Sequence, residues 1–302
     1  MSNIYALIVT FKRKELLKEV VKGVLQQSKS VSKIIIVDNN SNDGTEELIK
    51  KLNETSNIEI EYYNTGANLG GAGGFSFGFE QAIKYNFDYL WVMDDDVLPA
   101  PDCLELLEES ATNNIIVQPI RYNKDGSCAE YSPVIFDLDS IFITRPKRQT
   151  VVEMIDNSQN NEIALDGIPF EGPLVSRKII DTIGLPDARF FIFYDDLDFA
   201  LRAKNAGFQI ICKTNAKATR LLLNNQETDL QSWKGYFMLR NFFRIHFIHG
   251  KNIFVKIRPL IIAPVFIVKE LLFFRGKAAK ICLDALVDAL RYDFKVRNKY
   301  IP

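Results

Sequence analysis

The first 95 residues alternate short apolar runs with amphipathic stretches, and this alternation limits the folds open to the chain. Residues 4–9 (IYALIV) have the length of a buried strand, and apolar side chains then recur at helical spacing from Leu16 to Leu25. The unit repeats in residues 33–52 (KIIIVDNNSNDGTEELIKKL), where we expect Thr45 to cap the helix, and continues through IEIEYY and YLWVM. The sequence therefore predicts an α/β fold with a doubly wound sheet.

Acidic side chains directly follow two of these strands. Asp38 ends the second apolar run, and Asp94, Asp95 and Asp96 follow YLWVM. Ligands of doubly wound sheets bind beyond the carboxyl ends of the strands. Because side chains two apart on an extended segment share a face, Asp94 and Asp96 can converge while Asp95 points elsewhere. Adjacent carboxylates repel unless a cation offsets them, and a pair of them suits Mg²⁺ or Mn²⁺. The alternative is an acidic turn that caps a helix at Leu104.

A glycine-rich loop precedes the third expected helix. Residues 64–82 read NTGANLGGAGGFSFGFEQA. Such a loop lets backbone N–H groups approach an anion at a helix N-terminus, although a glycine-rich turn is also common without any ligand. Its spacing matches neither the GxGxxG pattern of nicotinamide sites nor a P-loop, so neither site is expected.

A second acidic cluster follows a polar, irregular stretch at residues 121–163. The segment FFIFYDDLDFALRAKNAGF returns to order and contains Asp195, Asp196 and Asp198 at the start of an expected helix. These side chains could stabilise the positive end of the helix dipole, or one of them could be a catalytic carboxylate. The pattern alone leaves both interpretations open.

The last part of the chain differs in charge from the rest. Residues 251–302 hold 11 Lys and Arg against 4 Asp and Glu, whereas the preceding residues hold 26 against 34. The apolar run from Leu260 to Phe274 is too short to span a bilayer and contains Lys269 and Glu270. Amphipathic segments with basic flanks suit the surface of an anionic membrane. The alternative is helical packing against the catalytic domain or against a partner subunit in a homo-oligomer.

Cysteine spacing and the N-terminus indicate the compartment. Cys103, Cys128, Cys212 and Cys282 show neither a Cys-x-x-Cys pair nor a zinc-ligand spacing, which is typical of reduced thiols in the cytoplasm. The N-terminal apolar run is too short for a signal peptide, and its basic residues come after it. We expect a cytoplasmic protein without a nucleic-acid partner.

Six motifs occur in a fixed order along the chain: ALIVTFKRKELL, IIIVDNNSNDGT, NLGGAGGFSFG, WVMDDDVLP, FFIFYDDLDFALRAKNAGF and YFMLRNFFR. In these motifs the chain resembles the family 2 glycosyltransferases of the GT-A fold, and among them the bacterial galactofuranosyl- and rhamnosyltransferases. The resemblance implies a GT-A catalytic domain over residues 1–245, with a nucleotide-binding half at about 1–120 and an acceptor-binding half at about 121–245. Residues 246–302 would form a basic, amphipathic helical tail.

The resemblance also implies roles for individual residues on the donor side. The residues that it places around the nucleotide sugar are Thr10, Phe11, Arg13, Asp38, Asn68, Gly71, Asp94 and Asp95. Asp38 would bind the base or the ribose. Asp94 and Asp96 match the DxD element, which holds Mn²⁺ or Mg²⁺ against the diphosphate.

On the acceptor side, Asp196 matches the general base that takes a proton from the attacking hydroxyl, and the reaction inverts the anomeric carbon. Asp195 would orient that base or the acceptor. One departure concerns the metal: related enzymes often have a metal-binding His in the region where this chain has Asn224 and Asn225. The only histidines, His246 and His249, come later in an expected helix and are interpreted as surface or packing residues.

Together these features predict an inverting, metal-dependent glycosyltransferase. We expect a UDP- or dTDP-linked donor, with galactofuranose or rhamnose favoured. The expected acceptor is a hydroxyl of a cell-envelope or capsular polysaccharide or of its lipid-linked precursor, at the inner face of the plasma membrane. The alternatives are a non-catalytic sugar-nucleotide-binding or scaffold subunit, and a nucleotidyltransferase, whose glycine-rich pyrophosphate-binding signature is missing from VTFKRKELL.

Overall fold

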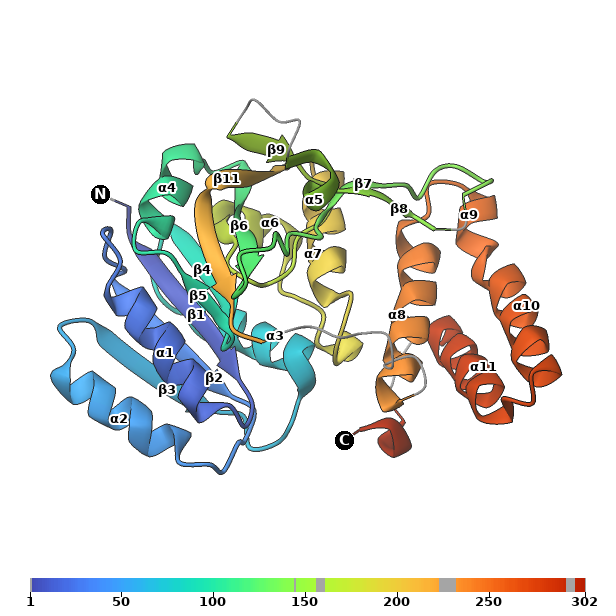
Figure 1. Cartoon of the computed structure of the whole chain (residues 1–302), viewed down its shortest axis with the longest axis horizontal. Coiled ribbons are helices and arrows are strands. Elements are labelled where there is room, and N and C mark those ends of the chain that lie inside the picture. Colours follow the sequence, from blue (N-terminus) through green and yellow to red (C-terminus); the bar gives the residue numbers. More distant parts are fainter. Residues whose placement is uncertain (1, 144, 156–160, 223–231, 292–296, 302) are drawn as a thin grey trace.

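The computed structural model describes residues 2–143, 145–155, 161–222, 232–291 and 297–301. Its first third alternates strand and helix as predicted (Figure 1): β1 (Ile4–Thr10), α1 (Lys14–Leu25), β2 (Lys33–Asp38), α2 (Thr45–Thr55), β3 (Glu59–Asn64), α3 (Gly70–Ala82) and β4 (Tyr89–Asp94). The prediction that Thr45 caps α2 was wrong by one position. Gly44 occupies the N-cap, and Thr45 is the first helical residue, with its N–H and hydroxyl donating to Oδ1 of Asp43 at 3.2 and 2.6 Å.

The rest of the chain completes the sheet and adds a helical region. The elements that complete the α/β part are β5 (Val97–Pro99), α4 (Cys103–Ser110), β6 (Ile115–Asn123), β7 (Pro133–Phe136), β8 (Lys147–Thr150), α5 (Val151–Met154), β9 (Glu162–Ala164), β10 (Leu174–Ser176), α6 (Arg177–Ile183), η2 (Ala188–Phe190), α7 (Asp195–Asn205) and β11 (Gln209–Arg220). The helical region consists of α8 (Trp233–His249), α9 (Ile253–Ile257), α10 (Pro259–Leu272), α11 (Gly276–Leu290) and η4 (Asn298–Tyr300).

The central sheet is mixed, with strand order β3-β2-β1-β4-β10-β6-β11-β5 and β9 paired to β11. Strands β1 to β4 run parallel to one another, and β6 runs parallel to β11. Because β10 is antiparallel to both β4 and β6, those two strands point the same way. The carboxyl ends of β1, β2, β4, β6 and β11 therefore meet at one edge of the sheet.

Hydrophobic side chains cover both faces of this sheet. Every residue of β1 is buried, and alternate positions face different cores. Leu7 packs with Phe79 of α3 and Phe199 of α7, whereas Ile8 packs in the core that Val20 of α1 contributes to on the other face. This two-sided burial fixes the sheet rigidly, so that its edge can hold side chains in defined positions.

A third core joins the helical region to the α/β part. It contains aromatic residues of α8, including Tyr236 and Phe237, together with Ile281 and Ala285 of α11. Phe191, from the loop before α7, belongs to the same core. Figure 1 shows α8 between the sheet and the outer helices α10 and α11. The predicted division at residue 245 thus falls inside α8.

Candidate active site

Strand register brings the predicted donor residues of three strands together. Val9 of β1 pairs with Asp94 of β4, and Thr10 pairs with Asp38 of β2. Thr10, Asp38 and Asp94 are the last residues of these parallel strands, so they gather at the carboxyl edge of the sheet. The edge carries the residues that the sequence pattern singled out.

The acidic triplet after β4 alternates in direction. Asp95 is buried, and its Oδ2 accepts hydrogen bonds from the Thr10 hydroxyl at 2.7 Å and from the Phe11 N–H at 3.4 Å. Asp94 and Asp96 are partly exposed. Nη1 of Arg13 lies 3.1 Å from Oδ1 of Asp95 and 3.2 Å from Oδ2 of Asp96. Asp95 therefore fastens the β1–α1 loop, while Asp94 and Asp96, the second of which shares Arg13, remain partly exposed.

Asp38 and the loop before α3 lie along the same edge. Asp38 is buried, with its Oδ1 accepting from the Ser41 N–H at 2.9 Å and its Oδ2 from the Tyr62 hydroxyl at 2.8 Å. Oδ1 of Asn68 accepts from the Gly70 N–H at 3.0 Å, which shapes the turn into α3. Gly71 faces open space, since a Cβ there would have no atom within 4 Å. The start of α3 thus leaves room for a ligand beside the sheet edge.

A second set of charged residues completes the edge, and the sequence interpretation missed it. Arg121, near the end of β6, forms a bidentate pair with Glu130 at 2.7 and 2.8 Å and a further ion pair with Glu171. Nε of Arg220, the last residue of β11, lies 3.3 Å from Oε2 of Glu171. Glu171 is therefore held by two arginines from two strands.

Antiparallel pairing explains why Glu171 was missed. The Gly172 N–H donates to the Val92 carbonyl at 2.8 Å, so the segment leading into β10 lies beside the end of β4. In an antiparallel strand it is the beginning, and not the end, that reaches the carboxyl edge of its neighbours. Strand direction cannot be read from composition, and FEGPLVS carried no other signal for a site.

The second acidic cluster begins α7. The N-cap position belongs to Tyr194, whose side chain makes no capping bond, and Oδ1 of Asp196 accepts from the adjacent Leu197 N–H at 2.7 Å. Asp198 has a different role, because its oxygens accept from Nε of Arg202 and Nε2 of His249, both at 2.8 Å. Asp198 links α7 to α8, whereas Asp196 is left available to a ligand.

Electrostatics connect the two acidic clusters. Burial raises the pKa of Asp96 to about 6, and the charge of Glu171 adds to this effect. Burial likewise raises the pKa of Asp196 to about 6, again with a contribution from Glu171. The pKa values of Asp94 and Asp195 are raised well above the ordinary value by burial and by their acidic neighbours. Since Glu171 acts on both clusters, they form one negatively charged site.

The protein oxygens offer an incomplete shell for a cation. Within the described ranges, no three His, Cys, Asp or Glu side chains are grouped so that they could hold a metal ion. Asn224 and Asn225 lie outside the described residues. Both histidines are buried in α8, and burial lowers the pKa of His246 to about 4. They pack within the protein, as expected.

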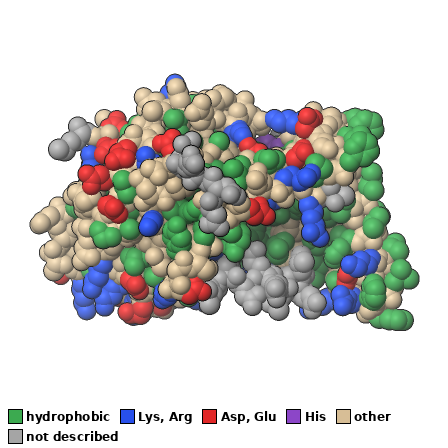
Figure 2. Space-filling view, turned by 45° about the horizontal axis from the view of Figure 1, so that its top comes forward, with side chains coloured by type: hydrophobic (Ala, Val, Ile, Leu, Met, Phe, Trp, Pro, Cys, Tyr) green, Lys and Arg blue, Asp and Glu red, His purple; other side chains and the backbone are tan. Residues whose placement is uncertain are grey.

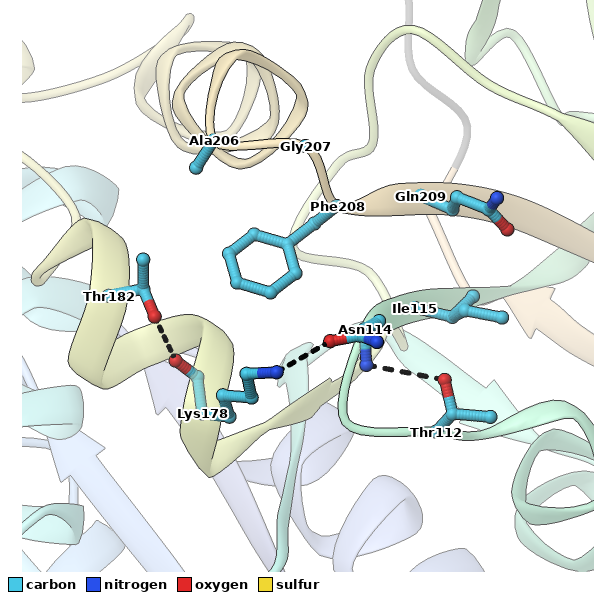
Figure 3. A pocket seen from close by; sticks show the side chains of 9 residues that line it. All are labelled: Thr112, Asn114, Ile115, Lys178, Thr182, Ala206, Gly207, Phe208 and Gln209. Atoms are coloured by element: carbon cyan, nitrogen blue, oxygen red, sulfur yellow. Dashed lines mark hydrogen bonds between the residues drawn. The ribbon is translucent and has the colours of Figure 1, made fainter.

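The cavity drawn in Figure 3 lies elsewhere. Its volume is 540 Å³, and its lining includes Ile115 and Gln209, which begin β6 and β11, together with Lys178, whose Nζ lies 2.9 Å from Oδ1 of Asn114. The site residues instead lie toward the other end of these strands: Arg121 is six residues beyond Ile115, or about 20 Å along β6 at 3.3 Å per residue. This cavity is therefore separate from the acidic edge.

The fold defines a class of protein. Two solved structures share it: GalNAc-T7 with UDP, GalNAc and Mn²⁺ has a TM-score of 0.64 at 15% identity, covering 86% of this chain and 51% of that chain. A mannosyltransferase from Pyrobaculum calidifontis in complex with GDP-Man and Mn²⁺ has a TM-score of 0.58 at 14% identity, covering 97% and 77%. The predicted GT-A fold with a helical C-terminal region is confirmed.

Sequence comparison identifies the family. Residues 5–170 match the profile described as Glycosyl transferase family 2, which is more than half of the chain, and the chain belongs to that family. The galactofuranosyltransferase GlfT1 of Mycolicibacterium smegmatis is 30% identical over 212 residues. The match covers 67% of this chain and 65% of that relative, so the chain spans slightly less than two thirds of its length. The predicted resemblance is confirmed.

Proposed function

We propose that the chain transfers a sugar from a nucleotide-sugar donor to a glycan hydroxyl with inversion at the anomeric carbon. The observation that carries the proposal is the common edge of the sheet. There Glu171 enters beside the end of β4, is held by Arg121 and Arg220, and adds to burial in raising the pKa both of Asp96 after β4 and of Asp196 at the start of α7. A donor diphosphate beside Asp94 and Asp96 and an acceptor hydroxyl beside Asp196 would thus meet in one site.

The donor would lie along the carboxyl ends of β1, β2 and β4. In this proposal Thr10, Phe11 and Arg13 border the nucleotide and Asp38 binds its base or ribose. The open space at Gly71 allows the start of α3 to approach the sugar diphosphate, since backbone N–H groups at a helix N-terminus attract anions. The exposed Arg13 side chain can exchange part of its pairing with Asp96 for a phosphate oxygen.

The available ligands fit a divalent cation. Asp94 and Asp96 supply only oxygen atoms, and burial together with acidic neighbours raises the pKa of both, so a bound cation would stabilise their ionised forms. Mg²⁺ and Mn²⁺ accept such ligands and take the rest of their shell from water and phosphate. When bound, the cation would neutralise charge on the departing diphosphate. Mn²⁺ is the first choice to test, because both structural neighbours contain it.

Asp196 would be the general base. It is partly exposed and makes no ion pair with a described residue, and a pKa of about 6 leaves it ionised at neutral pH yet more basic than an ordinary aspartate. It would take the proton of the acceptor hydroxyl while that oxygen attacks the anomeric carbon from the face opposite the leaving diphosphate. Asp195, buried beside it, would orient the base or the acceptor.

The preferred donor is UDP-galactofuranose, because the GlfT1 relative is a galactofuranosyltransferase. A dTDP-linked rhamnose is the second choice. The acceptor would be a hydroxyl of a cell-envelope or capsular polysaccharide or of its lipid-linked precursor.

A donor panel tests this function. Purified protein would be incubated with UDP-galactofuranose, dTDP-rhamnose or GDP-mannose, with Mn²⁺, Mg²⁺ or EDTA, and release of the nucleoside diphosphate would be measured. We expect release from one donor only, and loss of release in EDTA. Donor-dependent thermal stabilisation without any release would instead support the non-catalytic binding or scaffold subunit.

The helical region would bring the active site to a membrane. No described helix is both long enough and apolar enough to cross a bilayer. Figure 2 shows hydrophobic side chains gathered along the edge that this region forms. The large apolar side chains exposed on α9, α10 and the turn after α10 are Ile253, Phe254, Ile257, Leu260, Ile261, Val265, Val268, Leu271, Leu272, Phe273 and Phe274. We call these residues the apolar edge.

Charge favours a lipid surface as the partner of the apolar edge. Lys256, Lys269, Lys277 and Lys280 are exposed, and none of them pairs with a carboxylate of a described residue. An apolar band with exposed lysines on the same helices and on α11 matches an anionic bilayer, where lipid-linked acceptors would be presented at the cytoplasmic leaflet.

A liposome assay tests this contact. We expect the double variant Val265→Glu, Val268→Glu to lose sedimentation with liposomes that contain anionic lipid. Thr55→Glu adds a charge on α2, at the opposite end of the molecule in Figure 1, and should sediment like the wild type. If the double variant still sediments and instead turns a dimer into a monomer, the apolar edge is a subunit interface.

A further inference from the structure

The chain follows a strained path immediately before the second acidic cluster. Phe191, Phe193 and Tyr194 have φ of 64°, 68° and 69°, although none of them is glycine. At Phe191 ψ is −59°, and the Ile192 N–H donates to the Phe190 carbonyl at 2.8 Å, which makes a γ-turn of the rare, positive-φ type. Such a backbone persists only where its surroundings impose it.

Two buried side chains of α8 supply much of what this turn needs. Nδ2 of Asn241 lies within hydrogen-bond distance of three carbonyl oxygens, those of Phe190 (3.0 Å), Ile192 (2.8 Å) and Phe193 (2.9 Å). Nη2 of Arg240 donates to the Phe190 carbonyl at 2.9 Å and to the carbonyl before it at 2.8 Å. Nε of Arg240 also donates to Oδ1 of Asn241 at 2.9 Å, which fixes the orientation of the amide.

The opposite side of the turn rests on the start of α3. The Ala72 N–H donates to the Phe191 carbonyl at 3.1 Å. A Cβ at Gly70 would lie 2.1 Å from that carbonyl oxygen, so the close approach requires glycine there. The Phe191 ring stacks on Phe237 of α8, with ring centroids 4.8 Å apart. The turn is thus clamped between the donor-side helix and α8.

We propose that Arg240 and Asn241 are positioning residues that hold the turn at residues 190–194 and thereby aim Asp195 and Asp196 at the acceptor. The inference rests on the proposed function, in which Asp196 is the base. It assigns α8 a part in catalysis, because side chains of that helix fix the backbone from which the base projects. Without their donors, the carbonyls of the turn lose their partners and the strained residues relax.

Asn241→Ala and Asn241→Asp test the inference, since the first removes the amide and the second keeps its volume but replaces its donor with an acceptor. Misplacement of a catalytic group by about 1 Å costs on the order of 100-fold. We expect release of UDP from saturating UDP-galactofuranose to fall by about 10- to 100-fold in the better-folded variant. Affinity for UDP with Mn²⁺, measured by calorimetry, should change by less than about threefold.

Cys282→Ala is the matched control. It truncates a fully buried side chain of α11 that packs on α10, with its Sγ 3.9 Å from the Ala263 carbonyl oxygen. We expect it to lower the melting temperature and leave UDP release within twofold of the wild type. Hydrogen exchange should rise in peptides covering residues 188–196 in the Asn241 variants and not in the control.

The outcomes separate this inference from the proposed function. If Asp196→Asn lowers UDP release and the Asn241 variants do not, the positioning role is wrong and the base assignment stands. Equal losses in the Asn241 variants and Cys282→Ala would mean that destabilisation alone explains the effect. If the wild type releases no UDP, the proposed function fails, and unchanged exchange over residues 188–196 would overturn the inference independently.

Discussion

Replacing Asp196 with Asn separates acceptor activation from donor binding. The amide keeps an oxygen that can accept from the Leu197 N–H, now at 2.7 Å, so the start of α7 should stay intact. The base is lost, and general-base catalysis typically contributes 10²- to 10⁴-fold, or about 3 to 5 kcal/mol of barrier. We expect turnover to fall by that factor while affinity for UDP and Mn²⁺ stays near the wild-type value.

The pH dependence gives the same prediction a second readout. Burial raises the pKa of Asp196 to about 6, and a base works only in its ionised form. Turnover of the wild type should therefore be full above that pKa and fall about tenfold per pH unit below it. An ordinary aspartate, with a pKa near 3.9, would keep full turnover down to about pH 5. With Mn²⁺ saturating, so that the cation keeps Asp96 ionised, the acidic limb near pH 6 should vanish in Asp196→Asn.

The assay measures nucleotide release from pH 4.5 to 8 and donor affinity by calorimetry. Asp198→Asn is the matched control, because it makes the same change in the same helical turn at a side chain that pairs with Arg202 and His249. It should lose stability and keep the acidic limb. Asp195→Asn should cost less than Asp196→Asn if its role is orientation.

Three results would refute this reasoning. Full turnover in Asp196→Asn would mean that the cluster only stabilises the start of α7. Loss of UDP affinity as severe as in a DxD variant would assign Asp196 to the cation site. A larger loss in Asp195→Asn would reverse the roles of the two residues.

Three further predictions concern the site and its support. Asp96→Ala should weaken Mn²⁺-dependent UDP binding by about 10- to 100-fold or more, the loss typical of removing an outer-shell partner of a metal, and the melting temperature without metal should not fall. Unchanged Mn²⁺ dependence in calorimetry would exclude Asp96 as a metal ligand. Gly70→Ala should lower the free energy of unfolding, measured by urea denaturation, by about 2 kcal/mol or more, because φ of Gly70 is +71° and the Phe191 carbonyl oxygen occupies the space of a Cβ. Gly71→Ala should leave stability unchanged or raise it. Equal effects of the two substitutions would contradict the close contact between Gly70 and the turn. Glu171→Gln should move the acidic limb of the pH–turnover profile to lower pH, because removing a negatively charged neighbour favours the ionised form of Asp196. A limb that stays at the same pH or moves to higher pH would show that Glu171 does not act on the base.

Much of the sheet was predictable because its signals are local. The uninterrupted apolar run of β1 and the acidic ends of β2 and β4 place Asp38 and Asp94 at one edge once the strands are taken as parallel. Alternation along an extended segment also separated Asp95 from its two neighbours. These arguments need only strand periodicity and the ligand-binding rule for doubly wound sheets.

The remaining features depend on contacts between distant segments. Glu171 reaches the site because β10 runs antiparallel, and Arg121 and Arg220 meet it only after β6 and β11 have paired. Asn241 lies about 50 residues beyond the turn that it holds, and its motif gave no indication of a partner. Long-range pairing of this kind leaves no periodic trace in the sequence.

The double role of α8 sets a rule for building chimeric enzymes from this chain. Tyr236 and Phe237 belong to the core shared with α11, and one helical turn further on Arg240 and Asn241 supply the donors for the turn before Asp195. A junction at residue 245 would cut the helix between Asn241 and His249, which pairs with Asp198. A graft intended to change the acceptor or the membrane contact should therefore keep α8 whole with the parent α/β part and exchange only the residues after Gly250. Such a graft must also supply a matching apolar surface for Tyr236 and Phe237.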